Sequence, residues 1–280
     1  MTQQLKGHSA IVTGGGRGFG KVIASRFAAE GAAVTLTART RDELDRTVKE
    51  IVSAGGRAIG VCGDVTRPED VSRVVKAATE HFGPVTILVN NAGIPGPFAP
   101  TFVADPGEWW YAQEVHLRAP FLFIRSVLPS MIERRAGCII VVSAIGSYRV
   151  DHSMSAYCIG KTAQNRLVQL TAAEVREFGI SAFAIDPGFV ITGLAEITMR
   201  DAGAQRWVPH MIEHLKARKA DPQSVLDLDR CAQRCLDLAS GRYNALSGRY
   251  FELADDLEVM LRESGAPAAL AGLPLPPERA

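Results

Sequence analysis

The chain has 280 residues, of which 47% are hydrophobic, and its formal net charge is +1. This length and apolar content suffice for a substantial core in one α/β domain. The chain lacks the excess of basic residues with which proteins bind nucleic acids or anionic membrane surfaces. No uncharged apolar run reaches about 18 residues and the first ten residues hold no apolar signal segment, so we expect neither a membrane span nor a secretory signal.

The five cysteines lie mostly far apart, and only Cys231 and Cys235 have a spacing that suits one face of a helix. No histidine or cysteine lies nearby to complete a metal site with them. His210 and His214 share this spacing, but nothing in the sequence suggests a third ligand. We therefore expect free thiols in a cytoplasmic protein without a metal centre.

Short β-type runs alternate with longer helical stretches along most of the chain. Strands are predicted at His8–Thr13, Ala33–Ala38, Arg57–Cys62, Val85–Asn90, Cys138–Ser143 and Ile180–Ile185. Helices are predicted at Gly18–Glu30, Arg41–Ser53, Pro68–Phe82, Gly107–Arg134 and Ser155–Phe178. This alternation indicates an α/β fold with a doubly wound, Rossmann-type parallel sheet and helices on both faces. Such sheets bind ligands beyond the carboxyl ends of their strands.

The stretch Leu194–Leu228 breaks this rhythm, because many charges interrupt its apolar residues. We interpret it as a helical lid over the substrate, and a pair of surface helices is the alternative. A helix at Asp229–Ala239 and a last strand at Arg249–Leu253 follow. The segment Ser264–Ala280, rich in Ala, Pro and Leu, is predicted to be a frayed tail or an arm onto a neighbouring subunit. Because no linker is evident, residues 1–280 are expected to form a single domain.

A glycine-rich segment, Thr13–Gly20, joins the first predicted strand to the first predicted helix. Glycines at such a turn let backbone N–H groups approach a pyrophosphate, and the helix N-terminus adds a favourable dipole. A glycine string alone is weak evidence, but its place between a strand and a helix strengthens the prediction of a dinucleotide site. The predicted contacts are Gly14, Gly16, Arg17, Gly18, Phe19 and Gly20.

The end of the second predicted strand indicates which dinucleotide binds. An NAD site usually has an acid there, which binds the ribose 2′-hydroxyl, but the segment Thr37–Arg41 contains none. Arg39 and Thr40 stand at this position, and Arg17 is placed to reach the same corner from the glycine loop. Because two guanidiniums suit a dianionic 2′-phosphate, the sequence predicts NADP(H) as the cofactor.

Further motifs follow in order: Asp64-Val65, Asn90-Asn91-Ala92-Gly93, Tyr157-x-x-x-Lys161 and Pro187-Gly188-x-Val190-x-Thr192. With the glycine loop, they make residues 5–255 resemble the short-chain dehydrogenase/reductase family. The resemblance implies adenine contacts at Asp64 and Val65 and a homodimer or homotetramer, since the family's long helices usually pair across subunits. It also implies structural and cofactor roles for Asn91, Ala92 and Gly93, and nicotinamide contacts at Pro187, Gly188, Val190 and Thr192.

Tyr157 and Lys161 are four residues apart and share one face of the predicted helix, so both belong to the predicted cofactor and catalytic site. Free tyrosine titrates near pH 10, and a nearby ammonium would stabilise the phenolate and lower this pKa. Lys161 is placed to do this and to hold the nicotinamide ribose. We expect Tyr157 to donate the proton when a carbonyl is reduced and to accept it when an alcohol is oxidised.

Two positions depart from the family pattern, which usually adds a serine and an asparagine to this pair. Ala144 occupies the position of the serine. Ser143 is the provisional replacement, although strand alternation points it elsewhere, and Ser147 lies three residues after Ala144. His116 occupies the position of the asparagine and is the second provisional helper, because histidine can donate, accept and titrate near neutral pH.

These departures leave three interpretations open. In the first, Ser143 or the substrate compensates, and the chain is an NADP(H)-dependent oxidoreductase that interconverts a ketone and a secondary alcohol. In the second, the site performs redox-neutral chemistry, such as epimerisation or dehydration, with a bound cofactor. The loop residue His152 could then serve as an extra acid or base, and the alternative for His152 is a solvent-exposed side chain without a role. In the third, the chain is a cofactor-binding module with little catalysis. Apolar residues in Ile94–Val103, with Trp207 and Met211 of the lid, predict a small apolar substrate.

Overall fold

The computed structural model describes residues 3–191, 193–219 and 225–265, and within them it contains one parallel sheet of seven strands. The strands are β1 (Ser9–Thr13), β2 (Ala33–Ala38), β3 (Arg57–Cys62), β4 (Ile87–Asn90), β5 (Gly137–Val142), β6 (Ile180–Ile185) and β7 (Tyr250–Phe251). Their order is β3-β2-β1-β4-β5-β6-β7, and all neighbouring pairs are parallel. The order reverses between β1 and β4, which confirms the predicted doubly wound sheet and creates the crevice where such folds bind ligands.

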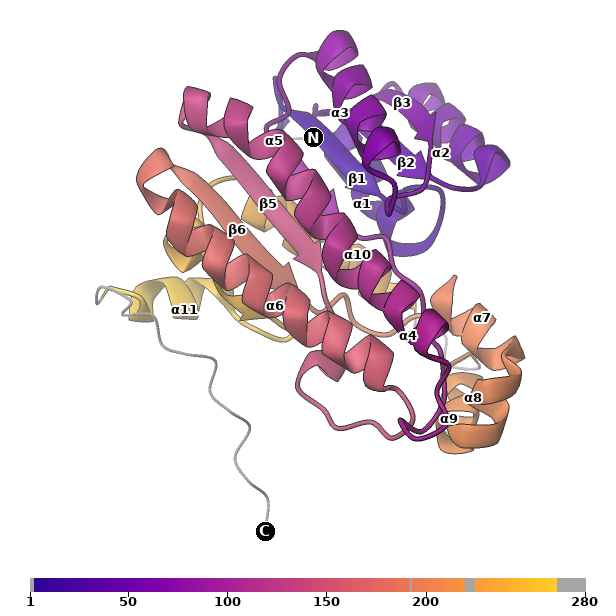
Figure 1. The fold of residues 1–280 in the computed structure, drawn as a ribbon. Helices are drawn as coiled ribbons and strands as arrows, with labels where there is room; N and C mark the ends of the chain where they lie inside the picture. The colour runs from indigo at the N-terminus through magenta and orange to yellow at the C-terminus, as the bar shows by residue number, and fades with distance from the viewer. Residues whose placement is uncertain (1–2, 192, 220–224, 266–280) are drawn as a thin grey trace.

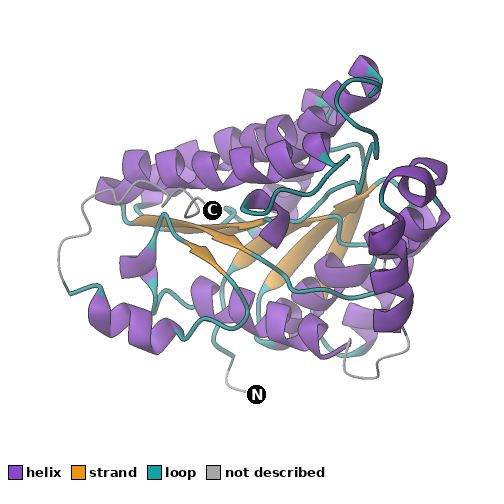
Figure 2. Cartoon of the chain, turned by 90° about the horizontal axis from the view of Figure 1, so that it is seen from below, coloured by secondary structure: helices purple, strands orange, loops and turns teal. Residues whose placement is uncertain are grey.

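Helices cover both faces of the sheet (Figure 1, Figure 2). One face is covered by α1 (Gly18–Ala29), α2 (Arg41–Ser53) and α10 (Leu226–Ala239), and the other by α3 (Pro68–Phe82), α5 (Ala119–Arg134) and α6 (Ser155–Val175). Successive strand residues point to opposite faces: Val12 packs with Phe27 of α1, whereas Ile11 packs with Phe123 of α5. Two apolar cores therefore hold the strands rigidly, and the loops at the strand ends are positioned by both.

The helical stretch predicted at Gly107–Arg134 contains a local irregularity. It consists of α4 (Pro106–Gln113), a π-helical turn (Glu114–Arg118) and α5. Pro120 has no N–H to donate to the His116 carbonyl four residues earlier, and the side chain of Gln164 in α6 donates to that carbonyl instead, at 2.7 Å. This π turn carries the predicted site residue His116 and was not predicted from the sequence.

Several other boundaries differ from the expectations. The last strand covers two residues rather than the five of Arg249–Leu253, and an additional helix, α11 (Leu257–Glu263), follows it. The N-terminus of α11 is capped by Asp256, whose carboxylate accepts from two backbone N–H groups. Residues 266–280, which make up most of the predicted tail, lie outside the described residues.

The predicted lid region contains α7 (Leu194–Arg200), α8 (Ala202–Trp207) and α9 (Pro209–Lys219), while residues 220–224 lie outside the described residues. These short helices group together beyond the end of the sheet toward which β5 and β6 point (Figure 1). Asp201 caps α8 by accepting from the Ala204 N–H at 2.7 Å. Val208 and Ile212 are buried against Phe98, which belongs to the loop after β4.

None of the helices that the structure describes combines the length and the apolarity needed to cross a bilayer. All five cysteines are free thiols. Across the described ranges, no three His, Cys, Asp or Glu side chains gather in a group that could hold a metal ion. Of the two lid histidines, His214 lies against the ring of Phe189, with 5.4 Å between ring centres.

Candidate active site

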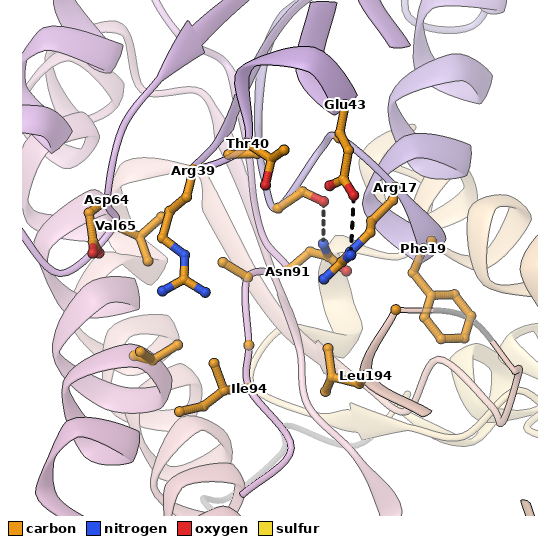
Figure 3. Close-up of a pocket in the computed structure, with 18 of the residues that line it drawn as sticks. Arg17, Phe19, Arg39, Thr40, Glu43, Asp64, Val65, Asn91, Ile94 and Leu194 are labelled. Carbon is orange, nitrogen blue, oxygen red and sulfur yellow. Dashed lines mark hydrogen bonds and ion pairs between the residues drawn. The ribbon is translucent and has the colours of Figure 1, made fainter. Parts of the chain in front are cut away.

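A cleft opens at the carboxyl ends of β1, β2, β3 and β4, where the strand order reverses (Figure 3). Its walls come from the loops after these strands, the first turn of α2 and the helical stretch that contains α4. The predicted cofactor residues that line it are Gly14, Gly16, Arg17, Gly18, Phe19, Arg39, Thr40, Asp64, Val65, Asn91, Ala92 and Gly93. Glu43, Tyr111 and Leu194 also line the cleft and were not predicted.

The glycine loop requires glycine because its backbone lies very close to neighbouring atoms. Gly14 has a φ of +65°, and a Cβ there would lie 2.8 Å from Asn91 Nδ2. A Cβ at Gly20 would overlap the Gly14 carbonyl. The turn therefore presents bare backbone at the N-terminus of α1, and this arrangement fits the pyrophosphate of a dinucleotide.

Asn91 joins the loop after β4 to the glycine loop. Its side-chain amide donates to the carbonyls of Thr13 and Gly14, at 2.9 and 3.3 Å. In return, the Thr13 hydroxyl accepts from the N–H groups of Asn91 and Ala92, at 2.9 and 3.0 Å. These four hydrogen bonds connect the two loops that face each other across the cleft.

Asp64 is held in a tight turn at the end of β3. Its carboxylate accepts from the N–H and hydroxyl of Thr66, at 2.9 and 2.8 Å. Its own N–H donates to the Asp70 carboxylate at 2.8 Å. The turn fixes Asp64 and Val65 at the edge of the cleft.

Two arginines lie at the corner of the cleft where β2 ends and α2 begins (Figure 3). The Arg39 guanidinium donates to the Tyr111 hydroxyl at 3.0 Å. The Arg17 guanidinium donates to the Glu43 carboxylate at 3.2 Å. Thr40 is the N-cap residue of α2, and its side chain makes no capping hydrogen bond. The corner thus contains two guanidiniums and a hydroxyl, and one guanidinium already has a carboxylate partner.

Tyr157 and Lys161 come together on α6 beside the loop after β4. The Lys161 ammonium lies 5.7 Å from the centre of the Tyr157 ring and donates to the Val142 carbonyl at 2.8 Å. The His116 ring meets the Tyr157 ring edge-on, with 5.3 Å between ring centres. A Cβ at Gly93 would lie 3.2 Å from His116 Cε1 and 3.9 Å from Lys161 Nζ. The structure therefore brings three of the four predicted catalytic side chains into one cluster next to the cofactor cleft.

His116 is fully buried, and its hydrogen bond determines which ring nitrogen carries the proton. Nε2 lies 2.9 Å from the Ile94 carbonyl, which can only accept, so Nε2 is the protonated nitrogen. Nδ1 is then a buried acceptor without a hydrogen-bond partner in the structure. Burial, assisted by the charge of Lys161, lowers the pKa of His116 to about 3. The expectation of titration near neutral pH is therefore wrong, and His116 is neutral.

Burial also affects the two groups expected to move the proton. It lowers the pKa of Lys161 to about 7, against the opposing charge of Asp186. It raises the pKa of Tyr157 above its ordinary value, and the charges of Asp186, Cys158 and Asp151 add to this effect. The predicted lowering of the Tyr157 pKa is therefore absent here, because burial disfavours both the phenolate and the ammonium.

The two serines near Ala144 have partners elsewhere. The buried Ser143 hydroxyl donates to the Lys161 carbonyl in the backbone of α6, at 3.2 Å. The Ser147 hydroxyl donates to the Ala144 carbonyl at 2.7 Å and accepts from the Asn165 amide at 2.9 Å. The structure thus corrects the assignment of Ser143 as the group that orients the substrate oxygen, because strand alternation turns it toward α6.

An acid that was not predicted, Asp186, lies at the carboxyl end of β6 beside the cluster. Its carboxylate accepts from the Ile145 N–H at 3.3 Å, in the turn that carries Ala144. Its charge acts on both Tyr157 and Lys161, and burial raises its own pKa. The available signal was an acid at a strand end, since ligands bind at this edge of a parallel sheet.

The motif after β6 lies next to α10. Gly188 has a φ of +79°, and a Cβ there would lie 2.7 Å from an Asp227 carboxylate oxygen. Pro187 and Val190 are buried, and none of these motif residues lines the cofactor cleft. Thr192, the last residue of the predicted nicotinamide contacts, lies outside the described residues.

Apolar side chains of the predicted lid pack beside Tyr157. Ala204, Val208 and Ile212 of this region form a cluster with Phe98 and Met154 from two other loops, and Tyr157, Cys158 and Met211 pack against it. Trp207, predicted for this wall, instead lies beside the Arg206 guanidinium, 4.6 Å from the ring centre. Phe102, in the other predicted segment, is 85% exposed. The exposed His152 is not part of the wall.

Similarity to known proteins identifies the family of this chain. The family model described as short chain dehydrogenase matches residues 8–202. The chain is 35% identical over 268 residues to a short chain dehydrogenase of Pseudocercospora fijiensis, across 93% of this chain and 84% of the relative. The chain belongs to the short-chain dehydrogenase/reductase family. This short-chain dehydrogenase/reductase is therefore a member of an oxidoreductase family whose proteins bind a nicotinamide cofactor.

Solved structures of similar proteins match this short-chain dehydrogenase/reductase over most of its length. A 7α-hydroxysteroid dehydrogenase complexed with NADH and 7-oxo glycochenodeoxycholic acid has a TM-score of 0.75 at 28% identity, over 90% of this chain and 94% of that chain. A gluconate 5-dehydrogenase of Burkholderia cenocepacia in complex with NADP and tartrate has a TM-score of 0.75 at 26% identity, over 90% and 95%. Because one complex contains NADH and the other NADP, the choice between them depends on the residues of this chain.

Proposed function

We propose that this short-chain dehydrogenase/reductase is an NADP(H)-dependent enzyme that interconverts a ketone and a secondary alcohol on a small apolar substrate. The observation that carries the proposal is the cluster of Tyr157, Lys161 and His116 beside the cofactor cleft. The nicotinamide cofactor supplies hydride exchange with a substrate carbon. In this proposal residues 1–280 form one domain, and its side chains position the substrate and move the proton.

Tyr157 is the proton donor in reduction and the acceptor in oxidation. Because burial raises its pKa, Tyr157 carries its proton near neutral pH, as a general acid must. Lys161 uses one N–H for the Val142 carbonyl, which leaves two donors for the hydroxyls of the nicotinamide ribose. The bare Nδ1 of His116 is a neutral acceptor that suits a water molecule in the proton path.

The coenzyme is NADP(H) because Arg17, Arg39 and Thr40 share the corner after β2 and no acid lies in Thr37–Arg41. A charge-assisted hydrogen bond contributes about 1.5–3 kcal/mol, or roughly 10- to 100-fold in affinity. Replacing Arg39 by aspartate should therefore weaken NADPH binding at least tenfold and leave NADH binding unchanged or tighter. An unchanged ratio of the two dissociation constants in Arg39→Asp would contradict this assignment.

The substrate is apolar because the lid cluster places Met154, Val208 and Ile212 around Tyr157. Ligand sites combine such walls with a few polar groups that fix orientation. Here Tyr157 is the polar group that would orient the substrate oxygen, and the charge of Asp186 acts on Tyr157. Small ketones and diketones with hydrocarbon substituents fit this combination better than highly charged metabolites.

The test is oxidation of NADPH by the purified protein with a panel of apolar ketones and diketones. Ala144→Ser is assayed in parallel, because a donor aimed at the developing oxyanion commonly contributes about 100- to 1000-fold in rate. We expect steady NADPH oxidation by the native chain and faster turnover by Ala144→Ser. Failure of both proteins to oxidise NADPH with any ketone of the panel would contradict the proposal.

Redox-neutral chemistry, such as epimerisation or dehydration, is the second candidate. It is favoured by one observation: Ser143 and Ser147 are both engaged elsewhere, while Asp186 adds an acid beside Tyr157. Such an enzyme would convert its substrate with no net change in the absorbance of the reduced nicotinamide. Product formation without net NADPH oxidation therefore separates it from the reductase.

A homodimer or homotetramer is the proposed assembly. The neighbouring helices α5 and α6 each leave a large apolar side chain in solvent, Phe121 and Leu170, both 47% exposed. The proposal places these two side chains in the face that pairs with another chain, since contiguous apolar surface marks protein–protein interfaces. Light scattering at micromolar concentration should give the mass of two or four chains, and a monomeric mass would contradict the assembly.

A further inference from the structure

Glu43 lies at the corner of the cleft where the negatively charged 2′-phosphate of NADP(H) is expected to bind. It belongs to the first turn of α2 and lines the cleft together with Arg17, Arg39 and Thr40 (Figure 3). Its carboxylate accepts a hydrogen bond from the Arg17 guanidinium at 3.2 Å. A carboxylate at this corner opposes a phosphate, because both carry negative charge and both compete for the same guanidinium.

The two arginines of the corner are therefore not equivalent. Arg39 donates to a neutral group, the Tyr111 hydroxyl, and keeps its full charge for an anion. Arg17 is compensated by Glu43 across an ion pair whose side chains are 52% and 30% exposed. An exposed pair of this kind exchanges partners readily, since each partner can be solvated when the other leaves.

We infer that Glu43 sets how strongly the corner discriminates between the two nicotinamide coenzymes. With NADP(H), Arg17 must be shared with the 2′-phosphate or released from Glu43, and the carboxylate repels the phosphate. With NAD(H), the carboxylate is free to accept a hydrogen bond from the ribose 2′-hydroxyl, the role that an acid at the end of the second strand has in NAD sites. Glu43 therefore reduces the factor by which the two arginines favour NADP(H) over NAD(H). This inference rests on the proposed binding of a nicotinamide coenzyme.

The size of the effect follows from the exposure of the pair. Loss of an exposed ion pair such as Arg17–Glu43 changes the dissociation constant of the coenzyme by at most about fivefold. Repulsion of a phosphate that carries nearly two charges adds to this. Removing the charge of Glu43 should therefore tighten binding of the phosphorylated coenzyme by roughly three- to tenfold.

The experiment compares Glu43→Gln with Glu50→Gln. Glu50 lies on the same helix and pairs with Lys21 of α1 at 2.6 Å, but it does not line the cleft. Dissociation constants are measured by calorimetry for NADPH and NADH, and for the fragments 2′,5′-ADP and 5′-AMP, which isolate the adenosine half. We expect Glu43→Gln to tighten NADPH and 2′,5′-ADP by the factor given above and to leave NADH and 5′-AMP unchanged or weaker. Glu50→Gln should leave all four constants unchanged.

The outcomes distinguish this inference from the proposed function. If Glu43→Gln leaves NADPH binding unchanged or weakens it, Glu43 only positions Arg17 or has no role, and the inference is overturned. If the native chain prefers NADH but Glu43→Gln moves the ratio toward NADPH, the NADP(H) assignment fails and the inference stands. If neither coenzyme binds to the native chain or to the variant, both are overturned.

Discussion

The buried, neutral His116 predicts a specific loss of stability in acid. In the folded chain its pKa is about 3, because burial and the charge of Lys161 disfavour the imidazolium. In the unfolded chain the same imidazole titrates near its ordinary value of about 6.5. Below that pH the unfolded state binds a proton that the folded state does not bind. The stabilisation is therefore complete above about pH 6.5 and is lost as the pH falls toward the folded value.

The magnitude follows from the width of this window. Each pH unit below the unfolded pKa lowers the free energy of unfolding by about 1.4 kcal/mol. Between about pH 7.5 and about pH 5, His116 alone should therefore lower it by roughly 2 kcal/mol. His116→Asn has no ionisable group at this position, so its loss over the same interval should be smaller by that amount. Any cost from the smaller side chain is independent of pH and cancels in the comparison.

The measurement is urea unfolding followed by tryptophan fluorescence at both pH values, at one fixed protein concentration because assembly affects apparent stability. His152→Asn is the control, since the His152 side chain is exposed in the folded chain. The control should lose as much stability as the native chain. Equal pH dependence in the native chain and His116→Asn would show that His116 protonates while folded, and the account of a neutral acceptor would be wrong.

Three further predictions concern the reaction itself. Tyr157→Phe should lower kcat/KM for ketone reduction at least about 100-fold with the dissociation constant for NADPH unchanged; retained turnover would remove Tyr157 from the proton path. Asp186→Asn should move the pH profile of alcohol oxidation to lower pH, because the Asp186 carboxylate adds to the burial that raises the pKa of Tyr157; an unmoved profile would show that its charge does not reach the phenol. Ile212→Ala should raise KM for apolar ketones about tenfold through loss of lid contact, whereas an equal rise for charged substrates would indicate a general loss of lid structure.

Much of the fold was predictable because local patterns and long-range packing agree. Ala33–Ala38, Arg57–Cys62 and Ile180–Ile185 were predicted with the ends that the structure shows, and all three are strands of the sheet. The alternation of strands and helices confines such a chain to a few parallel arrangements. The π turn around His116 was not predicted. Pro120 removes one helical hydrogen bond locally, but the Gln164 side chain that donates to the freed His116 carbonyl comes from a helix far along the chain.

In the candidate site as well, features set by local sequence were predictable and features set by long-range contacts were not. The glycine loop and the Tyr157-Lys161 spacing are local and were recognised, and the structure brings them to one end of the sheet. The roles of Glu43 and Asp186 depend on which distant groups lie beside them, Arg17 for one and Tyr157 for the other. The direction of the pKa shifts also depends on burial, which the tertiary structure determines.

The most direct test of the proposed reaction is the transfer of deuterium from NADPH that is labelled at both hydrogens of nicotinamide C4. The purified chain is incubated with the labelled coenzyme and the best apolar ketone of the panel, and the product is analysed by mass spectrometry. The proposed function predicts an alcohol that carries one deuterium at the former carbonyl carbon, with one NADPH oxidised for each product formed. A product without deuterium, or substrate consumed while NADPH stays reduced, would contradict it and favour the redox-neutral alternative.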